Sequence, residues 1–257
     1  MIGKALGIVF AFALLGPSVP AGHGAAGMTA PSEFVCGAAS SATPIATPAP
    51  PLATAVAPPA ASPAAPPLRP VADIPLPGGA SRFDYQSFDP TTGRLSIAHM
   101  GADQIVAFDT RASNVIGTVD DIKTPTGVLA VPALGRVFVS ETARRDVAII
   151  DAQSLRVVGR TGAIGFPDGL AYAPQAKRVF VSDESGGGEL VIDATTSKAV
   201  ATIDIGGEAG NTQYDAGSGC IVVAVQNRDQ LVAIDPATDR IVGRFDLGAD
   251  CRTPHGV

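Results

Sequence analysis

The sequence predicts an all-β fold, a β-propeller of four-stranded antiparallel blades, because one pattern recurs at a constant interval of 42 residues. Short apolar runs end in an aspartate at four places with this interval: Asp109, Asp151, Asp193 and Asp235. Two further series have the same spacing: Pro90, Pro132 and Pro174, and then Arg94, Arg136, Arg178 and Cys220. A repeat of this length that is filled with short strands is typical of propeller blades.

The third repeat shows the order of strands expected within one blade. Residues 169–172 are small and apolar, as an inner strand requires, and residues 178–182 supply a second strand. A third strand covers 189–192 and a fourth covers 198–203, with turn residues between them. Applied along the chain, this order predicts blades at 83–119, 125–161, 167–203 and 209–245, and the start of a fifth at residue 254.

The residues before these blades have a different composition. Residues 1–21 resemble a signal peptide, because Lys4 precedes a short apolar run and small residues surround Ala21. That run is shorter than the roughly 20 residues that cross a bilayer, so no membrane span is expected after cleavage. Residues 22–70 are rich in Ala and Pro and predict a disordered linker. We therefore expect a periplasmic or secreted protein whose folded part covers residues 71–257.

Charge and cysteine content narrow the classes of function. The net charge of −6 gives no basic footprint for nucleic acid, so we expect no nucleic-acid partner. Cys36, Cys220 and Cys251 have no metal-like spacing, and their separations do not suggest a disulfide framework. Cys220 opens a strand where the other repeats carry Arg, and we predict a small buried apolar residue there.

The four repeated aspartates have a local explanation. Each stands where the third strand of a repeat enters a turn, and an Asp side chain there accepts hydrogen bonds from backbone N–H groups further along the turn. Since the same group recurs in every repeat, we predict that Asp109, Asp151, Asp193 and Asp235 are structural turn residues and not catalytic ones.

The repeats resemble the YVTN family of β-propeller repeat proteins over about residues 71–257. The resemblance lies in the turn Asp89-Pro90-Thr91-Thr92-Gly93-Arg94, in its counterpart over 235–242, and in tetrads such as Phe138-Val139-Ser140-Glu141. It implies a ring of seven blades and an exported protein. About four blades are present, and residues 71–76 resemble the outer strand that closes such rings, so we expect a fragment of a longer ring.

The expected binding face carries the residues that differ between repeats. In an up-and-down blade, the loops after the second and fourth strands lie on one face, around the mouth of the central channel. The loops that lead into first strands carry Asp84, Thr126, Asp168, Asn211 and His255. The loops after second strands carry His99, Glu141 and Asp183. Variation on a rigid repeat predicts that these residues bind a ligand or a partner.

The sequence favours a binding or scaffold protein over an enzyme, with a protein partner or a small-molecule ligand at the channel mouth. It contains neither a Gly-x-Ser-x-Gly nucleophile motif nor a Cys-x-x-Cys-His haem motif. One alternative is a metal-dependent, lactonase-like hydrolase, with Asp84, Asp168 and His255 as candidate ligands of Ca²⁺ or Zn²⁺. Another is a propeller subunit of a quinone or haem redox system. No cofactor is required by any motif.

Overall fold

The computed structural model describes Cys36, residues 70–249 and residues 251–257. The expected signal peptide and all of the expected linker except Cys36 and residue 70 lie outside the described residues. Within them, the chain forms four antiparallel sheets, each with its four strands in sequence order. The predicted fold class is therefore confirmed, with four blades seen.

The strands of the first two blades follow one another along the chain. Blade 1 consists of β1 (Gln86–Asp89), β2 (Arg94–His99), β3 (Gln104–Asp109) and β4 (Asn114–Asp120). Blade 2 consists of β5 (Pro125–Val131), β6 (Arg136–Glu141), β7 (Asp146–Asp151) and β8 (Arg156–Thr161). The first strand of blade 1 thus begins at Gln86, where the sequence predicted a start at about residue 83.

The second pair of blades repeats this order. Blade 3 consists of β9 (Pro167–Ala173), β10 (Arg178–Asp183), β11 (Gly188–Asp193) and β12 (Lys198–Asp204). Blade 4 consists of β13 (Ala209–Asp215), β14 (Cys220–Val225), β15 (Gln230–Asp235) and β16 (Arg240–Asp246). Three short 3₁₀ turns, Met100–Ala102, Pro132–Leu134 and Gln226–Arg228, lie in the hairpin connections.

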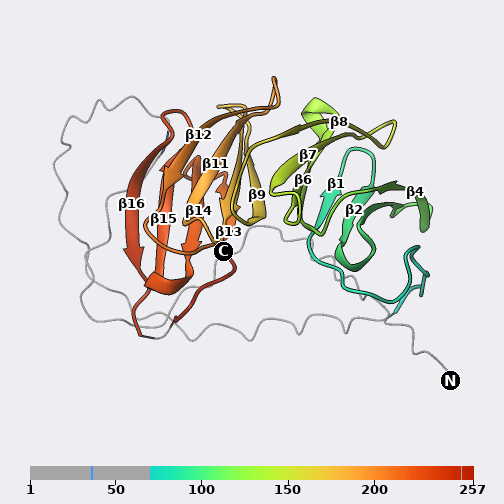
Figure 1. Cartoon of the computed structure of the whole chain (residues 1–257), viewed down its shortest axis with the longest axis horizontal. Coiled ribbons are helices and arrows are strands. Elements are labelled where there is room, and N and C mark those ends of the chain that lie inside the picture. The colour runs from blue at the N-terminus through green and yellow to red at the C-terminus, as the bar shows by residue number, and fades with distance from the viewer. Residues whose placement is uncertain (1–35, 37–69, 250) are drawn as a thin grey trace, which may run out of the picture.

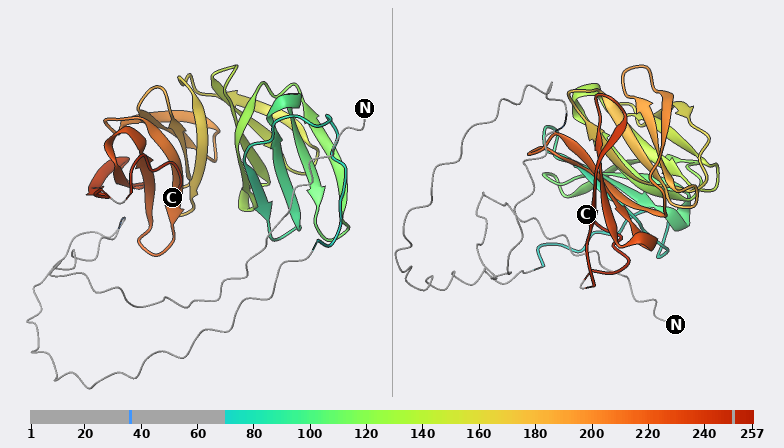
Figure 2. Two further views of the ribbon diagram at one scale, coloured as in Figure 1. Left: turned by 90° about the horizontal axis from the view of Figure 1, so that it is seen from below. Right: turned by 90° about the vertical axis from the view of Figure 1, so that its left-hand side faces the viewer.

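The blades stand side by side in an arc, from blade 1 at one end to blade 4 at the other (Figures 1 and 2). The first strands of neighbouring blades contact one another: β1 with β5, β5 with β9, and β9 with β13. The fourth strands are exposed and carry charged residues such as Arg156 and Arg240, as solvent-facing sheet edges do. Residues on the first strands are therefore the ones that different blades bring together.

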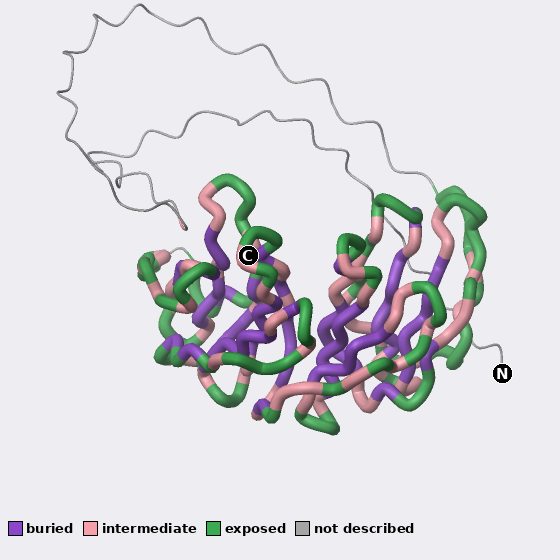
Figure 3. The backbone as a smooth tube through the Cα atoms, turned by 90° about the horizontal axis from the view of Figure 1, so that it is seen from above, coloured by how far each residue is buried: buried purple, intermediate pink, exposed green. Residues whose placement is uncertain are grey.

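The core lies in the seams between blades, where buried apolar residues of adjacent sheets pack together. The buried stretches of the strands are purple in Figure 3. Phe138 and Ile149 of blade 2 pack against Val179 and Ile192 of blade 3. One blade later, Phe180 and Val191 pack in the same way against blade 4. Burial of apolar surface stabilises a fold by about 25 cal/mol per Å², so these seams are the main source of stability.

The hairpin turns explain the repeated aspartates. Asp109 Oδ1 accepts hydrogen bonds from the N–H groups of Arg111 (2.8 Å) and Ala112 (2.9 Å), and Asp193 Oδ1 accepts from Thr195 (3.0 Å) and Thr196 (2.9 Å). Asp151 and Asp235 accept equivalent bonds within their own turns. Backbone hydrogen bonds lower the pKa of Asp109, Asp151 and Asp193. These contacts fit a turn-fixing role.

Each connection after a second strand contains one residue with left-handed backbone. These residues recur at the repeat interval: Asp103 (φ 53°), Arg145 (φ 61°), Gly187 (φ 70°) and Asp229 (φ 52°). The turn geometry is thus constant across blades even though the residue type changes. The side chain at this position can therefore vary without altering the loop.

The N-terminal end of the arc differs from expectation. Residues 71–76 form no strand, although the sequence resembled an outer strand. Instead, Ile74, Leu76 and Phe83 pack against the apolar face of blade 1 that has no blade before it in the described chain. The segment therefore covers that face through side chains and not through sheet pairing.

The prediction for Cys220 is wrong in one respect. Cys220 is buried, but it forms a disulfide with Cys36, and Cys36 N–H also donates to Ser218 O at 2.9 Å. The sulfur stands where blades 2 and 3 carry Arg136 and Arg178, which pair with the turn aspartates of their own blades. Cys251 is exposed and unpaired. No helix among the described residues has the length and apolarity to cross a membrane.

Candidate functional site

The loops after second strands and those after fourth strands form one surface, which we call the mouth face. Three backbone hydrogen bonds at the repeat interval join them: Thr142 N–H to Thr124 O (3.2 Å), Glu184 N–H to Phe166 O (3.0 Å) and Gln226 N–H to Glu208 O (2.9 Å). Side chains on this face are therefore presented by a connected backbone.

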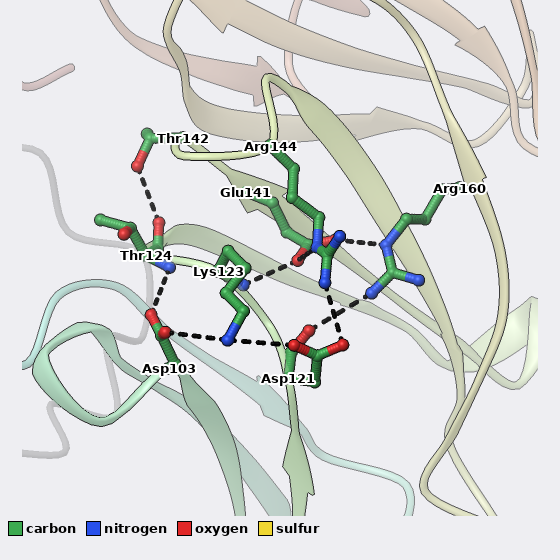
Figure 4. A network of polar contacts seen from close by, with 8 residues as sticks. All are labelled: Asp103, Asp121, Lys123, Thr124, Glu141, Thr142, Arg144 and Arg160. Carbon is green, nitrogen blue, oxygen red and sulfur yellow. Dashed lines mark hydrogen bonds and ion pairs between the residues drawn. The ribbon is translucent and has the colours of Figure 1, made fainter.

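Glu141 is the centre of a polar network on the blade 1 to blade 2 part of this face (Figure 4). Its fully buried carboxylate accepts from Lys123 N–H (2.7 Å), from Arg144 Nε (3.1 Å) and from Arg160 Nε (2.7 Å). Arg144 also contacts Asp121, at 2.9 Å. The Glu141 carboxylate thus fastens the loop that arrives from blade 1.

Asp183 does the same one blade later. It accepts hydrogen bonds from Gly165 N–H (2.8 Å) and Phe166 N–H (2.7 Å), in the loop that leads into blade 3. In blade 4 the role passes to Asn227, whose Oδ1 accepts from Glu208 N–H at 2.9 Å.

His99 and Thr126 are also occupied within the fold. The buried His99 ring stacks on Phe83, and its nitrogens lie 2.8 Å from Ser81 Oγ and 3.0 Å from Pro77 O. Thr126 Oγ1 is buried and donates to Pro167 O at 2.9 Å. His99, Thr126, Glu141 and Asp183 are therefore engaged in supporting the loops.

The other predicted residues converge on Tyr85. The Tyr85 hydroxyl is hydrogen-bonded to Asn211 Oδ1 and lies 3.4 Å from Asp168 Oδ2, so that it links blade 1 to blades 3 and 4. Asn211 N–H donates to the backbone oxygen of His255 at 2.7 Å, which places the C-terminal segment beside β13. Tyr85, Asp84, Asp168, Asn211 and His255, together with Glu184, form what we call the Tyr85 cluster.

Burial and neighbouring carboxylates give this cluster unusual acid–base properties. Asp168 is 5% exposed, and its pKa is raised to about 6 by burial first and then by the charges of Asp84 and Glu184. The imidazole of His255 acts in the opposite direction. The pKa of Tyr85 is raised as well, by burial and by Asp168. Asp168 therefore changes charge within the physiological pH range, while Tyr85 stays a neutral hydroxyl.

The candidate residues predicted from the sequence included neither Tyr85 nor Glu184. A signal for Tyr85 was available, because the repeat places Gly127, Gly169 and Asn211 at the equivalent positions. Glycine there lets adjacent first strands approach: a Cβ on Gly127 would meet Asp168 O at 1.9 Å. Tyr85 is the one large side chain in this series, and it marks the position of the cluster.

A cleft of about 530 Å³ opens beside the cluster, between the loops of blades 3 and 4. We call it the blade 3–4 cleft. Its lining residues are Phe166, Glu184, Ser185, Gly186, Gly187, Gly207, Glu208 and Asn227. Glu184 belongs to both the cleft and the Tyr85 cluster. In the part of the chain that the structure describes, no three His, Cys, Asp or Glu side chains are grouped to hold a metal ion.

The fold and this loop face define the chain as a β-propeller protein, and solved structures agree. Hydrazine synthase from Kuenenia stuttgartiensis matches with a TM-score of 0.58 at 18% identity, over 62% of this chain and 47% of that one. Dihydro-haem d1 dehydrogenase NirN matches with a TM-score of 0.53 at 16% identity, over 69% and 39% respectively. The chain thus spans about half the length of the first and about two fifths of the second.

No protein-family model and no curated protein matches the sequence. At these identities the structural likeness establishes the propeller fold and not an activity.

Proposed function

We propose that this chain belongs to an exported propeller protein that binds a ligand or a protein partner at the Tyr85 cluster. One observation carries the proposal: the Tyr85 hydroxyl, from the start of blade 1, meets the side chains of Asp168 in blade 3 and Asn211 in blade 4. The backbone N–H of Asn211 in turn bonds the C-terminal segment at His255 O. Structural polar residues usually serve their own blade or the next one, as Asp183 does. A group assembled from distant repeats is better explained by binding.

Two features support export. The Cys36–Cys220 disulfide fits an oxidising compartment, because cytosolic thiols are kept reduced. The N-terminal pattern of Lys4, an apolar run and small residues fits a signal peptide. We likewise propose that the repeats are related to the YVTN family, on the sequence resemblance described above.

The chemistry of the cluster favours a cationic ligand. Asp168 and Glu184 supply negative charge, and Asn211 and Tyr85 supply hydrogen-bonding groups. Asp84 adds a carboxylate that is paired with Arg82 at 3.1 Å. A bound cation stabilises the ionised form of Asp168, so binding releases a proton near pH 6. We therefore expect affinity for cations to fall as the pH is lowered from 7 to 5.

A thermal-shift and calorimetric screen with CaCl₂, ZnCl₂ and small amines tests this proposal. At least one cation is expected to stabilise the protein, and Asp168→Asn and Tyr85→Phe are each expected to weaken its binding about tenfold. Asp73→Asn, an exposed site away from the cluster, is the control for the change of net charge. Binding that neither cluster variant alters would refute the assignment.

The hydrolase alternative rests on Asp84, Asp168 and His255, of which Asp84 raises and His255 lowers the pKa of Asp168. It requires that Ca²⁺ or Zn²⁺ bind and that the loaded protein hydrolyse a lactone, which a metal titration followed by an ester assay would detect. A redox role is suggested only by the names of the two structural neighbours. It predicts a shifted haem absorption band when the protein is titrated with haem.

A further inference from the structure

Arg145, in the seam between blades 2 and 3, provides an internal comparison for the blade 3–4 cleft. Arg145 occupies the left-handed position of the loop after β6, and its Nε donates to Gly165 O, in the loop leading into blade 3, at 3.0 Å. The guanidinium group thus bridges two loops across the blade 2 to blade 3 seam. In this hydrogen bond the donor is charged and the acceptor is a neutral carbonyl. Such a bond is stronger than one between two neutral groups.

One repeat later, the same frame lacks that side chain. Gly187 stands at the position of Arg145, with φ of 70° against 61°, and Gly207 stands at the position of Gly165. A Cβ built on Gly187 would lie 3.2 Å from Gly207 O, so this position points at the equivalent carbonyl. No hydrogen bond from a described residue reaches Gly207 O, and the blade 3–4 cleft opens at this place.

The walls of the cleft suit a planar cation. Glu184 and Glu208 both line it, and neither forms an ion pair with a described residue. Among the described residues, the Glu184 side chain accepts a long hydrogen bond, 3.5 Å from Gln226 Nε2. Phe166 adds an aromatic ring, which attracts cations over its face. Carboxylates and a carbonyl are the acceptors that a guanidinium fork matches.

A buried group in the same seam also lacks a partner. Glu189, two residues after Gly187, is fully buried and turned toward blade 4, with the Thr212 hydroxyl beside it. Neither its carboxyl oxygens nor that hydroxyl has a hydrogen-bond partner among the described residues. The equivalent positions hold Ile105, Val147 and Leu231, so the acid is particular to the seam that carries the cleft.

We propose that the blade 3–4 cleft is a binding site for a guanidinium group, held by Glu184, Glu208 and the Gly207 carbonyl as Arg145 is held by Gly165. The ligand is either an arginine side chain within a peptide or a free guanidine compound such as L-arginine. The inference rests on the proposed function, because it makes the cleft a subsite of the same binding face.

The test measures binding of the peptide acetyl-Gly-Arg-Gly-amide to the full chain by calorimetry, with L-arginine and the lysine version of the peptide as further arms. Saturable binding of the arginine peptide is expected, with the lysine peptide weaker. Glu184→Gln and Glu208→Gln are each expected to weaken binding about tenfold, since each removes one charge-assisted contact. Asp73→Asn is the charge-matched control and should change nothing.

The variant Gly187→Arg supplies the missing side chain from within the protein. Arg145 shows that arginine adopts this backbone conformation, so the variant should fold. It is expected to raise the Tm and to abolish peptide binding, because its own guanidinium occupies the cleft. Should this variant fail to fold, the two glutamine variants still decide the question.

The possible outcomes separate the two proposals. Binding that Glu208→Gln leaves unchanged but Asp168→Asn removes would overturn the cleft site while the Tyr85 cluster stands. No binding of any guanidinium probe at 20 mM, roughly 2 kcal/mol of affinity on the standard scale, would also overturn it. Equal binding of L-arginine and the peptide would assign a free guanidine ligand, and preference for the peptide would assign a protein partner.

Discussion

Two fully buried glutamates in neighbouring blades have opposite surroundings. Glu141 receives hydrogen bonds from Lys123 N–H, Arg144 and Arg160, whereas both carboxyl oxygens of Glu189 lack a partner among the described residues. Burial raises the pKa of Glu189 well above its usual value. One carboxylate is thus held by a network of donors, whereas burial in an apolar seam disfavours ionisation of the other.

The difference shows how a repeat protein separates stability from function. The blade 1 to blade 2 part of the mouth face uses its charges internally, so little is left for a ligand. In the blade 3–4 part, Glu184, Glu208 and Asp168 form no ion pair with a Lys or Arg of the described chain. A polar group that costs stability is retained more readily where it serves binding.

The largest expected effect is on the Glu141 network. Glu141→Ala leaves Arg144, Arg160 and the Lys123 N–H without their shared acceptor, and we expect it to destabilise the protein by roughly 3 kcal/mol. Urea denaturation followed by circular dichroism measures this. A loss below about 1 kcal/mol would mean that the network contributes little to stability, and it would remove the contrast with Glu189.

The opposite sign is expected at Glu189. Glu189→Val reproduces the residue that blade 2 has at Val147 and removes a buried carboxyl without a partner. We expect a gain of about 1–2 kcal/mol in the free energy of unfolding. The matched change Val147→Glu should destabilise the chain. A clear loss of stability in Glu189→Val would show that this carboxyl has a stabilising partner.

The pH dependence of stability should separate Glu189 from Asp168. Both pKa values are raised by folding, so the stability each acid contributes is present at low pH and lost as the pH rises through its folded pKa. For Asp168 the loss should fall between about pH 4 and 6, and Asp168→Asn should remove it. The raised pKa of Glu189 should give a separate loss of stability with rising pH, which Glu189→Gln should remove. Melting curves from pH 4 to 9 measure both, and unchanged curves would contradict the shifts.

The smallest effect is expected at the exposed rim of the Glu141 network. Asp121 contacts Arg144 and Lys123 at 2.9 Å and 3.0 Å, but its side chain is 67% exposed. Asp121→Asn should therefore lower the urea midpoint of unfolding far less than Glu141→Ala does, and 0.5 M NaCl should reduce that small effect further. A salt-independent effect as large as that of Glu141→Ala would show that the rim is as important as the buried carboxylate.

Much of this architecture could be predicted from the sequence because it is periodic. The blades and the four turn aspartates recur at one interval, so each position is observed four times within the chain. The same periodicity could also have identified two unusual positions. Tyr85 stands in a series that contains Gly127 and Gly169, and Glu189 stands in a series that contains Val147 and Leu231. Both exceptions lie where the surroundings are unusual.

The rest of the site depends on contacts that no local pattern encodes. Nothing in the sequence shows that the Tyr85 hydroxyl reaches Asn211, because the two residues lie 126 positions apart. Similarly, a carboxylate such as Glu141 or Asp183 looks available for binding until its loop partners are seen. The pairing of Cys36 with Cys220, at a separation of 184, is of the same long-range kind.

That disulfide makes part of the molecule a covalent circle. The chain from residue 36 to residue 220 is closed on itself, and the circle includes blades 1 to 3 and β13. A protease that cuts once within residues 37–69 would open the circle without releasing a fragment until the bond is reduced. The ends of the arc, at blade 1 and blade 4, are thus linked both through the row of blades and through the N-terminal segment.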